Sequence, residues 1–331
     1  MCFCRADKFT NNATSDMIIQ VILQKEICLE MKERQKGNFI LLLTAMVWGM
    51  GFVAQKAGAA LEPFTYNGIR MVLAGIFLIP VIFAIRRKRS RDGGVDKNVS
   101  VITSVKGGMC CGVVLCFGAN LQQFGIYFQT DAGKAGFITA LYILIVPILC
   151  IFLKKKVSVI SWICVFLGIA GFYCLTMAGK GQGGHLSFGD FFVLLCAIAF
   201  AVHIVVVDHY TETCDGVILA ATQFFTAGCI SLILMLVFES PDIGMIKTLW
   251  LPIVYGGLFS CGIGYTLQVI GQQYANPTTG SMIMSLESVF SVVFGVLLLG
   301  ERMTLIEMIG CAIIFVAVML PQVVEILGDN K

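Results

Sequence analysis

The feature that most constrains this chain is a series of apolar runs of about 20 residues, separated by short clusters of charged residues. A helix of that length crosses the hydrocarbon core of a lipid bilayer, which is ~30 Å thick. Hydrophobic residues make up 58% of the 331 residues and charged residues only 13%, whereas soluble domains carry about 25% charged residues. The sequence therefore predicts an all-α, polytopic membrane protein.

The apolar runs predict ten transmembrane helices joined by short connections, so that consecutive helices lie antiparallel. The expected spans are 38–57, 64–85, 105–128, 133–153, 157–178, 189–208, 216–238, 249–273, 278–299 and 303–322. Residues 1–36 precede them as an N-terminal extension, and residues 323–331 form a C-terminal tail. Residues 1–30 contain no run of spanning length and lack the pattern of a signal peptide, so Met31 is a candidate for the true start.

Lysine and arginine gather on one side of the predicted membrane. The basic clusters within 32–36, 86–106 and 154–156 all fall on the same side when the spans alternate. Loops rich in Lys and Arg stay cytoplasmic, so the N-terminus and, after ten spans, the C-terminus are expected in the cytoplasm of a cell with this protein in its plasma membrane. The basic run therefore reports topology, and no nucleic-acid partner is expected.

A short pattern, G-x-x-L-Q-x-x-G, occurs at Gly118–Gly125 and again at Gly264–Gly271, offset by 146 residues. Such self-similarity indicates two copies of one unit. Each copy holds five spans, an odd number, so the second copy begins on the opposite side of the membrane. The chain is thus expected to be a 5+5 inverted repeat of residues 37–178 and 188–322. That arrangement is typical of transporters.

Polar side chains inside the spans are candidates for contact with a substrate, because a polar group in lipid must face a partner helix or a water-filled cavity. Asn120 and Gln123 share one face of the third span, and Tyr265, Gln268 and Gln272 share one face of the eighth. Amides beside an aromatic ring suit a small zwitterion or a heterocycle. The alternative for each amide is a hydrogen bond between helices, worth roughly 0.6 kcal/mol.

Other residues of the spans have two interpretations as well. Gln122 is flanked by glycines of the repeated pattern, which favours helix packing over substrate contact. Trp48 and Tyr142 are candidate ring walls of a cavity, although aromatic residues in membrane helices usually pack against neighbours. His203 is a candidate cavity residue, but a lone buried histidine is more often a satisfied core residue than a proton relay.

Two charged residues are expected within the membrane. Glu287 lies about nine residues into the ninth span, ~13 Å deep, where a carboxyl group can carry a proton, gate the path or hold helices together. Arg70 enters the second span near its outer end, where it can snorkel or bind a carboxylate, with Glu287 as a possible partner. Lys134 lies in the first turn of the fourth span and can reach water.

Several function classes lack support in the sequence. The 14 cysteines lie mostly in apolar runs, so neither a disulfide framework nor a metal site is expected. No His-Glu-x-x-His, Gly-x-Ser-x-Gly or Walker motif occurs, so no catalytic residues and no cofactor are assigned. Without an ATP-binding loop, this chain alone cannot drive transport with ATP.

Four stretches resemble the drug/metabolite transporter superfamily, specifically its EamA-type members with ten helices. They are Ala45–Gly49 with a Trp-Gly pair, Ala135–Tyr142 running into Val146-Pro147, Ser285–Glu287, and Gly300–Arg302. The family usually follows the Glu287 position with proline, where this chain has Ser288. The first copy also has Lys155 in place of the acidic residue that closes the second copy.

The resemblance implies an inverted-repeat exporter of small metabolites, often amino acids or related compounds. We therefore expect a secondary transporter that works by alternating access, with a small-molecule substrate, a surrounding bilayer, and protons as a candidate coupling ion. One alternative is a membrane-embedded enzyme that modifies lipids, for which Asp208 and His209 are scattered candidates. Another is a non-transporting scaffold or sensor. The substrate and the oligomeric state remain open at this point.

Overall fold

The computed structural model describes residues 35–91, 100–142, 144–146, 149, 159–176, 187–211, 213–272, 274 and 283–328. Throughout this part the chain is helical and contains no strand. Six helices are long and apolar enough to cross a membrane: Gln35–Ala57, Pro63–Arg87, Val101–Tyr127, Phe188–Val207, Gly216–Phe238 and Trp250–Gln268. Four apolar helices are shorter: Ala132–Val146, Trp162–Leu175, Ile283–Leu299 and Leu305–Ala317. The all-α membrane class is confirmed, while Met31 and the rest of the extension before residue 35 lie outside the described residues.

Helix Gln35–Ala57 opens the described part of the chain. The elements that follow it in the first half are α2 (Pro63–Arg91), α3 (Val101–Tyr127), α4 (Ala132–Ala140) and α6 (Val159–Thr176). In the second half they are α7 (Phe188–Thr211), α8 (Gly216–Phe238), α9 (Ile243–Thr248), α10 (Trp250–Val254), η1 (Tyr255–Gly264), α11 (Tyr265–Gln272), α13 (Glu287–Phe294), η2 (Gly295–Leu299) and α14 (Leu305–Gly328).

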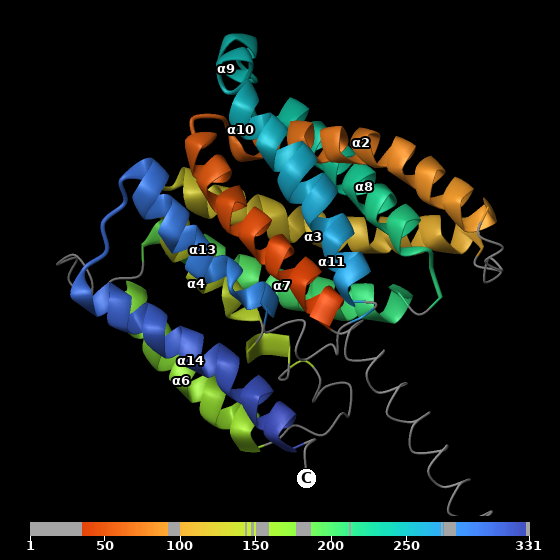
Figure 1. Cartoon of the computed structure of the whole chain (residues 1–331). Coiled ribbons are helices and arrows are strands. Elements are labelled where there is room, and N and C mark those ends of the chain that lie inside the picture. Colours follow the sequence, from red (N-terminus) through yellow and green to blue (C-terminus); the bar gives the residue numbers. More distant parts are fainter. Residues whose placement is uncertain are drawn as a thin grey trace, which may run out of the picture.

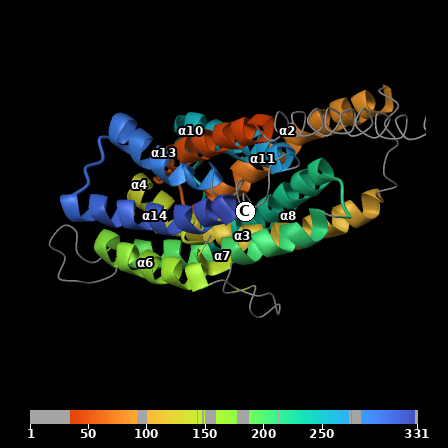
Figure 2. The same cartoon turned by 60° about the horizontal axis from the view of Figure 1, so that its bottom comes forward.

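The helices pack mainly in pairs that join the two halves of the chain. α2 lies along α8, α6 along α14, and α4 against α13. α3 contacts both α7 and α8, and α2 contacts η1. The pair α6 and α14 runs side by side in both views (Figures 1 and 2). α4 also contacts α7 and α14, so it links that pair to the rest of the bundle.

Large apolar side chains cover the outer surface of the bundle. Phe83, Phe166, Leu236 and Leu305 are each between 69% and 74% exposed. Soluble proteins rarely leave large contiguous apolar surfaces in water, whereas lipid tails accept them without cost. This distribution agrees with helices that face a bilayer.

Glycines of the repeated pattern are points of close helix approach. A Cβ atom added at Gly118 would lie 3.4 Å from the ring of Phe200, and one added at Gly264 would lie 2.6 Å from Trp48 Nε1. Small residues at such positions let helix backbones approach closely. The first glycine of each copy therefore accommodates an aromatic ring from the helix packed against it.

The last glycines of the two copies show the same correspondence. A Cβ added at Gly125 would lie against Val193 and 2.8 Å from the carbonyl oxygen of Gly189. One added at Gly271 would lie 2.7 Å from the Leu41 side chain and 3.3 Å from the carbonyl oxygen of Gly37, one turn earlier in that helix. The repeated pattern thus makes matching contacts with α7 in one half and with helix Gln35–Ala57 in the other.

Two of the shorter helices, Ala132–Val146 and Ile283–Leu299, each contain a local turn that breaks the α-helical hydrogen-bond pattern. α4 is followed by a turn at Leu141, whose amide donates to the carbonyl three residues earlier (3.2 Å) instead of four. The helix that contains α13 has the same kind of turn at Leu286, again at 3.2 Å. Tyr142 follows the first turn and Glu287 the second. Because α4 packs against α13, both interruptions lie in one pair of helices.

The eighth expected span, 249–273, is continuously helical from residue 250 to residue 272, but its hydrogen-bonding pattern changes along its length. A π-helix, η1, separates α10 from α11. η1 contains Gly256, Gly257, Gly262 and Gly264, and glycine weakens the α-helix by about 1 kcal/mol per residue. The same glycines let α2 approach: a Cβ at Gly257 would lie 2.8 Å from the carbonyl oxygen of Arg70. Wide π-turns of this kind are frequent at functional sites.

Candidate substrate-binding site

A group of buried polar side chains surrounds Arg70 on α2. Arg70 is 4% exposed. Its Nε donates to Asn67 Oδ1 (2.7 Å) and its Nη2 to Gln55 Oε1 (3.4 Å). The guanidinium also lies over the Tyr66 ring, 5.4 Å from the ring centroid. The first-half helices thus place a buried cation among neutral partners.

The hydrogen-bonded chain continues from Asn67 into α3 and α8. Asn67 Nδ2 donates to Asn120 Oδ1 (3.0 Å), and Asn120 Nδ2 donates to Ser231 Oγ (2.8 Å). On the other side, Gln123 Nε2 donates to the carbonyl oxygen of Gln55 (3.3 Å). The Gln123 Oε1 atom is buried and has no hydrogen-bond partner. Asn120 and Gln123, predicted as one face, are therefore brought together around Arg70.

Glu287 stands at the start of α13 and is 5% exposed. Its carboxyl group has no hydrogen bond or ion pair with any residue that the structure describes. Tyr142, Cys196 and Tyr265 interact with it electrostatically. Arg70 is not its partner here, because the guanidinium is held by amide oxygens instead. The pairing considered from the sequence is therefore absent between these two described side chains.

Aromatic rings lie next to these polar groups. Trp48 and Tyr265 are 4.8 Å apart between ring centroids, and Tyr265 and Phe224 are 5.0 Å apart. Trp48 Nε1 donates to the carbonyl oxygen of Ser260 in η1 (3.1 Å). Among the titratable groups, Tyr265 lies in the neighbourhood of both Arg70 and Glu287. Trp48 and Tyr265 thus form an aromatic wall beside the buried cation and the buried carboxyl group.

His203 lies apart from that wall, on the contact between α7 and α8. It is buried, and its Nε2 is 3.0 Å from Gln223 Oε1. Its ring meets Phe200 edge to face, with centroids 6.3 Å apart. This geometry matches the packing interpretation of the histidine, since an amide partner satisfies the ring nitrogen.

The glutamines of the repeated pattern differ in their contacts. Gln122 is buried, and its Nε2 donates to Thr139 Oγ1 on α4 (3.2 Å). Gln268 is half-buried and forms no hydrogen bond with the described residues. The side chain of Gln272 lies outside the described part of the chain. Gln122 therefore joins two helices, while the amide of Gln268 keeps its hydrogen-bonding capacity.

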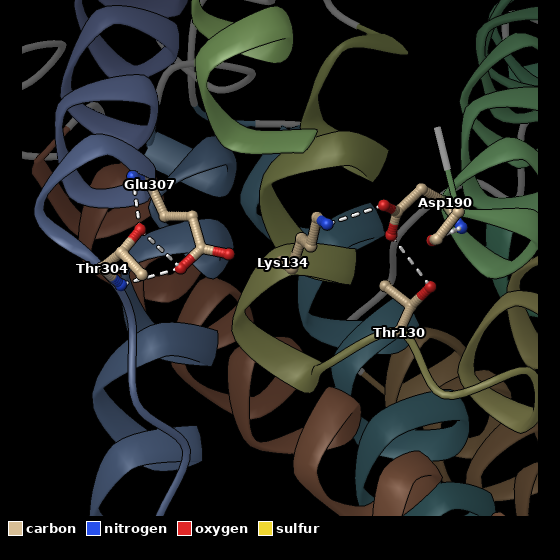
Figure 3. Close-up of polar contacts among 6 residues, drawn as sticks. Thr130, Lys134, Asp190, Thr304 and Glu307 are labelled. Carbon is tan, nitrogen blue, oxygen red and sulfur yellow. Dashed lines mark hydrogen bonds and ion pairs between the residues drawn. The ribbon is translucent and has the colours of Figure 1, made fainter. Parts of the chain in front are cut away.

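Lys134 has an ion-pair partner that sequence reasoning missed. Its Nζ lies 2.6 Å from Asp190 Oδ2, and Thr130 Oγ1 lies 3.1 Å from Asp190 Oδ1 (Figure 3). The side chain of Asp190 is 1% exposed and that of Lys134 is 16% exposed, so the ion pair is largely shielded from water. Asp190 lies close to the predicted start of the second copy at residue 188, but nothing in the sequence pointed to Lys134 as its partner.

Two further carboxylates accept hydrogen bonds from the amides of helix N-termini. Glu301 accepts hydrogen bonds from the amides of Ala132 (2.6 Å) and Gly133 (3.1 Å), at the start of α4. Glu239 accepts from the amides of Phe64 (2.8 Å) and Thr65 (2.7 Å), at the start of α2. These amides have no partner within their own helix, so a carboxylate both satisfies them and complements the helix dipole.

The Glu307 side chain forms hydrogen bonds with Thr304, at the start of its own helix, α14. Its Oε2 accepts from the amide of Thr304 (2.7 Å) and from Thr304 Oγ1 (3.0 Å), while the Glu307 amide donates back to that hydroxyl (3.3 Å) (Figure 3). This reciprocal arrangement is a capping box. The Thr-x-x-Glu spacing in the sequence is the signal that could have located it.

The residues considered for a lipid-modifying site form no catalytic group in the described structure. His209 is exposed at the end of α7, with its ring against Tyr210. The side chain of Asp208 lies outside the described residues. Among the residues that the structure describes, no cluster of His, Cys, Asp or Glu could hold a metal ion.

Comparison with known proteins agrees with this architecture. A protein of Archaeoglobus fulgidus, described as an uncharacterized transporter, is 28% identical over 95% of this chain and 94% of its own length. A chloroplastic WAT1-related protein of Arabidopsis thaliana is 24% identical over 85% of this chain and 68% of its own length. A solved crystal structure, 17% identical, shares the fold with a TM-score of 0.63 over 88% of this chain and 98% of the other.

The match to a protein family is more direct. The profile of the EamA-like transporter family matches residues 35–177 and, a second time, residues 187–321. Together the two matches cover almost all of the chain outside its N-terminal extension. The geometry of the helices and both matches lead to one conclusion: this chain belongs to the EamA-like transporter family.

Proposed function

We propose that the protein is a secondary transporter of the plasma membrane that exports a small metabolite, an amino acid or a related compound, by alternating access. Two halves of five helices each, 37–178 and 188–322, rock against each other around a central site. The N- and C-termini lie in the cytoplasm. A transporter of this family works on a small molecule within a lipid bilayer, and protons are the candidate coupling ion.

The observation that carries this proposal is the pair of interrupted helices, α4 and α13. Secondary transporters bind their substrates near the membrane midplane, where helices are discontinuous. Here both interruptions, at Leu141 and Leu286, lie in one helix pair, and Glu287 emerges directly after the second. A buried carboxyl group without a described partner at such a point is poorly explained by structure alone, because burial of an unpaired charge is costly.

Matching contacts in the two halves support the rocking movement. Gly118 faces Phe200 as Gly264 faces Trp48, and the family profile matches each half separately. Two halves with equivalent packing but opposite orientation can exchange their arrangements, which opens the central site to each side of the membrane in turn. Ten helices in a 5+5 inverted repeat account for these contacts.

The aromatic wall and the amides beside it suit a small substrate with both apolar and polar parts. Trp48, Tyr142 and Tyr265 supply rings, while Gln268 supplies an amide that forms no hydrogen bond with the described residues. Asn120, Gln123 and Gln272 complete the proposed lining, while His203 packs against Gln223 at the contact between α7 and α8. Pockets for small molecules combine mostly apolar walls with a few polar groups that fix orientation.

Glu287 is proposed as the gating carboxyl group of the transporter. Protonation would let it lie in an apolar environment, and deprotonation would require a charged or hydrogen-bonding partner, such as an amine of the substrate. Either change alters the packing of α13 against α4. A proton carried by Glu287 would couple transport to the pH gradient.

Reconstitution into proteoliposomes tests the proposal. Purified protein is tested for counterflow of each of the twenty amino acids, with and without an imposed pH gradient, beside protein-free liposomes. Substrate-specific flux that exceeds the empty liposomes is the expected result. No flux of any compound by a folded, monodisperse protein would favour the scaffold or sensor interpretation instead. Topology is tested separately by a C-terminal fluorescent-protein fusion, which is expected to fluoresce because that end is cytoplasmic.

A further inference from the structure

We propose that Arg70 binds a carboxylate of the transported substrate, and that the substrate carries an amino or hydroxyl group close to that carboxylate. This inference rests on the proposed transport function and adds the chemical class that the site accepts. It treats Arg70 as a substrate-binding residue rather than a residue that only joins helices.

The first observation is the missing counter-charge. Arg70 is nearly fully buried, and a buried charge in a membrane protein is costly unless an opposite charge or strong hydrogen bonds compensate it. The titratable groups that interact with it electrostatically are Tyr66, Cys261 and Tyr265. All of these are neutral in their usual form. Within the described residues Arg70 forms no ion pair, so no described residue supplies its counter-charge.

The second observation is that the guanidinium has donors left over. Arginine has five N–H donors in a planar fork. The structure uses one at Nε and one at Nη2, the latter in a long bond of 3.4 Å. The Nη1 group has no hydrogen bond with any described residue. A carboxylate can accept two parallel bonds from such a fork, and this geometry is among the strongest in proteins.

The third observation is an acceptor without a donor on Gln123, which, like Arg70, forms a hydrogen bond with Gln55. Gln123 is completely buried, and its Oε1 has no partner. Its Nε2 donates to the Gln55 carbonyl, which fixes the orientation of the amide. A carboxylate cannot donate to this oxygen, whereas an amino or hydroxyl group can. Arg70 has N–H donors that a carboxylate could accept, and Gln123 has an acceptor oxygen that needs a donor. A substrate that satisfies both is an acid with a nearby N–H or O–H group.

The charge of the site limits the ligand further. One buried guanidinium surrounded by neutral amides balances one negative charge. A monocarboxylate fits that balance, while a phosphate dianion would leave one charge without a counter-charge. An amine without a carboxylate would add a second cation to the site, and like charges repel strongly in a low-dielectric environment.

The test uses matched sets of three compounds: an amino acid, its amide and the amine left after decarboxylation. Leucine, leucinamide and isoamylamine form one set; phenylalanine, phenylalaninamide and phenethylamine form another. Binding to the wild-type protein is measured by thermal shift, and transport by counterflow in proteoliposomes. We expect the acids to raise the melting temperature and to exchange, and the amides and amines to do neither.

Variants connect that preference to Arg70. Arg70→Gln should reduce counterflow of the acid about tenfold or more, which is the loss expected for one charge-assisted contact. Arg70→Lys keeps the charge but loses the planar fork, so it should transport the acid more weakly and still reject the amine. Arg302→Gln, at an exposed position outside the site, is the matched control and should behave as the wild type.

The outcomes separate this inference from the proposed function. Amides or amines that bind and exchange as well as the acids would overturn the role of Arg70 while transport itself stands. So would acid counterflow that is unchanged in a folded Arg70→Gln protein. A wild-type protein that neither binds nor moves any member of either set, or any other amino acid, would count against the proposed function and against this inference with it.

Discussion

Corresponding positions in the two halves make the same backbone contacts but carry different polar side chains. Gly125 and Gly271 both receive a neighbouring helix at close range. Near the position that corresponds to Arg70, the second half has Gln223, whose Oε1 lies 3.0 Å from His203 Nε2. At the position that matches Glu287, the first half has Leu141. The two ionisable groups without a described counter-ion therefore occur once each, in different halves.

This difference suggests a division of labour. Under the proposed function, matching backbone contacts allow the two halves to exchange arrangements at little cost in packing. The unmatched side chains would then place different polar groups at the two ends of the proposed site, so that a substrate with distinct ends would bind in one orientation. Under the proposed function, the contacts that match between the two halves permit the movement, and the polar side chains that differ between the halves determine the specificity.

The residues that close the corresponding spans of the two halves also differ in charge. Glu301 holds the first amides of α4, and its counterpart in the first half by position is Lys155. Lysine has donors only and cannot accept a hydrogen bond from a helix N-terminus. The structure of residue 155 lies outside the described part of the chain. The sequence therefore places no carboxylate at the position that corresponds to Glu301.

The strongest test of the comparison is Glu287→Gln. We expect counterflow to fall about tenfold or more, since removal of an interaction worth 1.4 kcal/mol changes a rate or affinity tenfold. Any response to a pH gradient should disappear as well, because glutamine does not take up a proton. The folded state should survive, since Glu287 forms no described hydrogen bond that the amide would break. Unchanged transport with an unchanged pH response would contradict both roles of the carboxyl group.

The next test substitutes alanine at matched glycines. Gly125→Ala brings a Cβ to 2.8 Å from a backbone carbonyl oxygen, whereas at Gly271 the nearest obstacle is the flexible Leu41 side chain. Overpacking costs about 1–3 kcal/mol when the backbone must move. We therefore expect Gly125→Ala to lower the free energy of unfolding by that amount and Gly271→Ala to lower it less. Denaturation of both variants in one detergent provides the measurement, and a larger loss at Gly271 would argue against the contacts described here.

A third test addresses the cap of α4. Glu301→Ala leaves the amides of Ala132 and Gly133 without their acceptor, and lost helix caps cost about 1 kcal/mol. Glu301→Gln retains one acceptor oxygen and should lose less. Thermal unfolding of the two variants measures the difference. If both variants melt like the wild type, the carboxylate does not stabilise α4.

The sequence predicted the helical class and the general place of the polar residues, because apolar runs and isolated polar residues within them are local signals. The sequence could not predict which residues these polar side chains contact. Asp190 meets Lys134, and Glu239 meets the start of α2, across long separations in sequence that only tertiary packing closes. The π-helix η1 was likewise missed, since glycines lower helix propensity without specifying the wider turn.

Gln122 and Gln268 provide the finest comparison, because the same residue occupies the same place in each copy of the pattern. Gln122→Leu removes the hydrogen bond to Thr139 and should cost only about 0.6 kcal/mol of stability, with transport nearly unchanged. Gln268→Leu removes no described hydrogen bond, so stability should hold while counterflow falls. The two variants are compared in one denaturation series and one counterflow series. A result with the roles exchanged would mean that Gln122 is the glutamine that meets the substrate, and that the hydrogen bond to Thr139 breaks during transport.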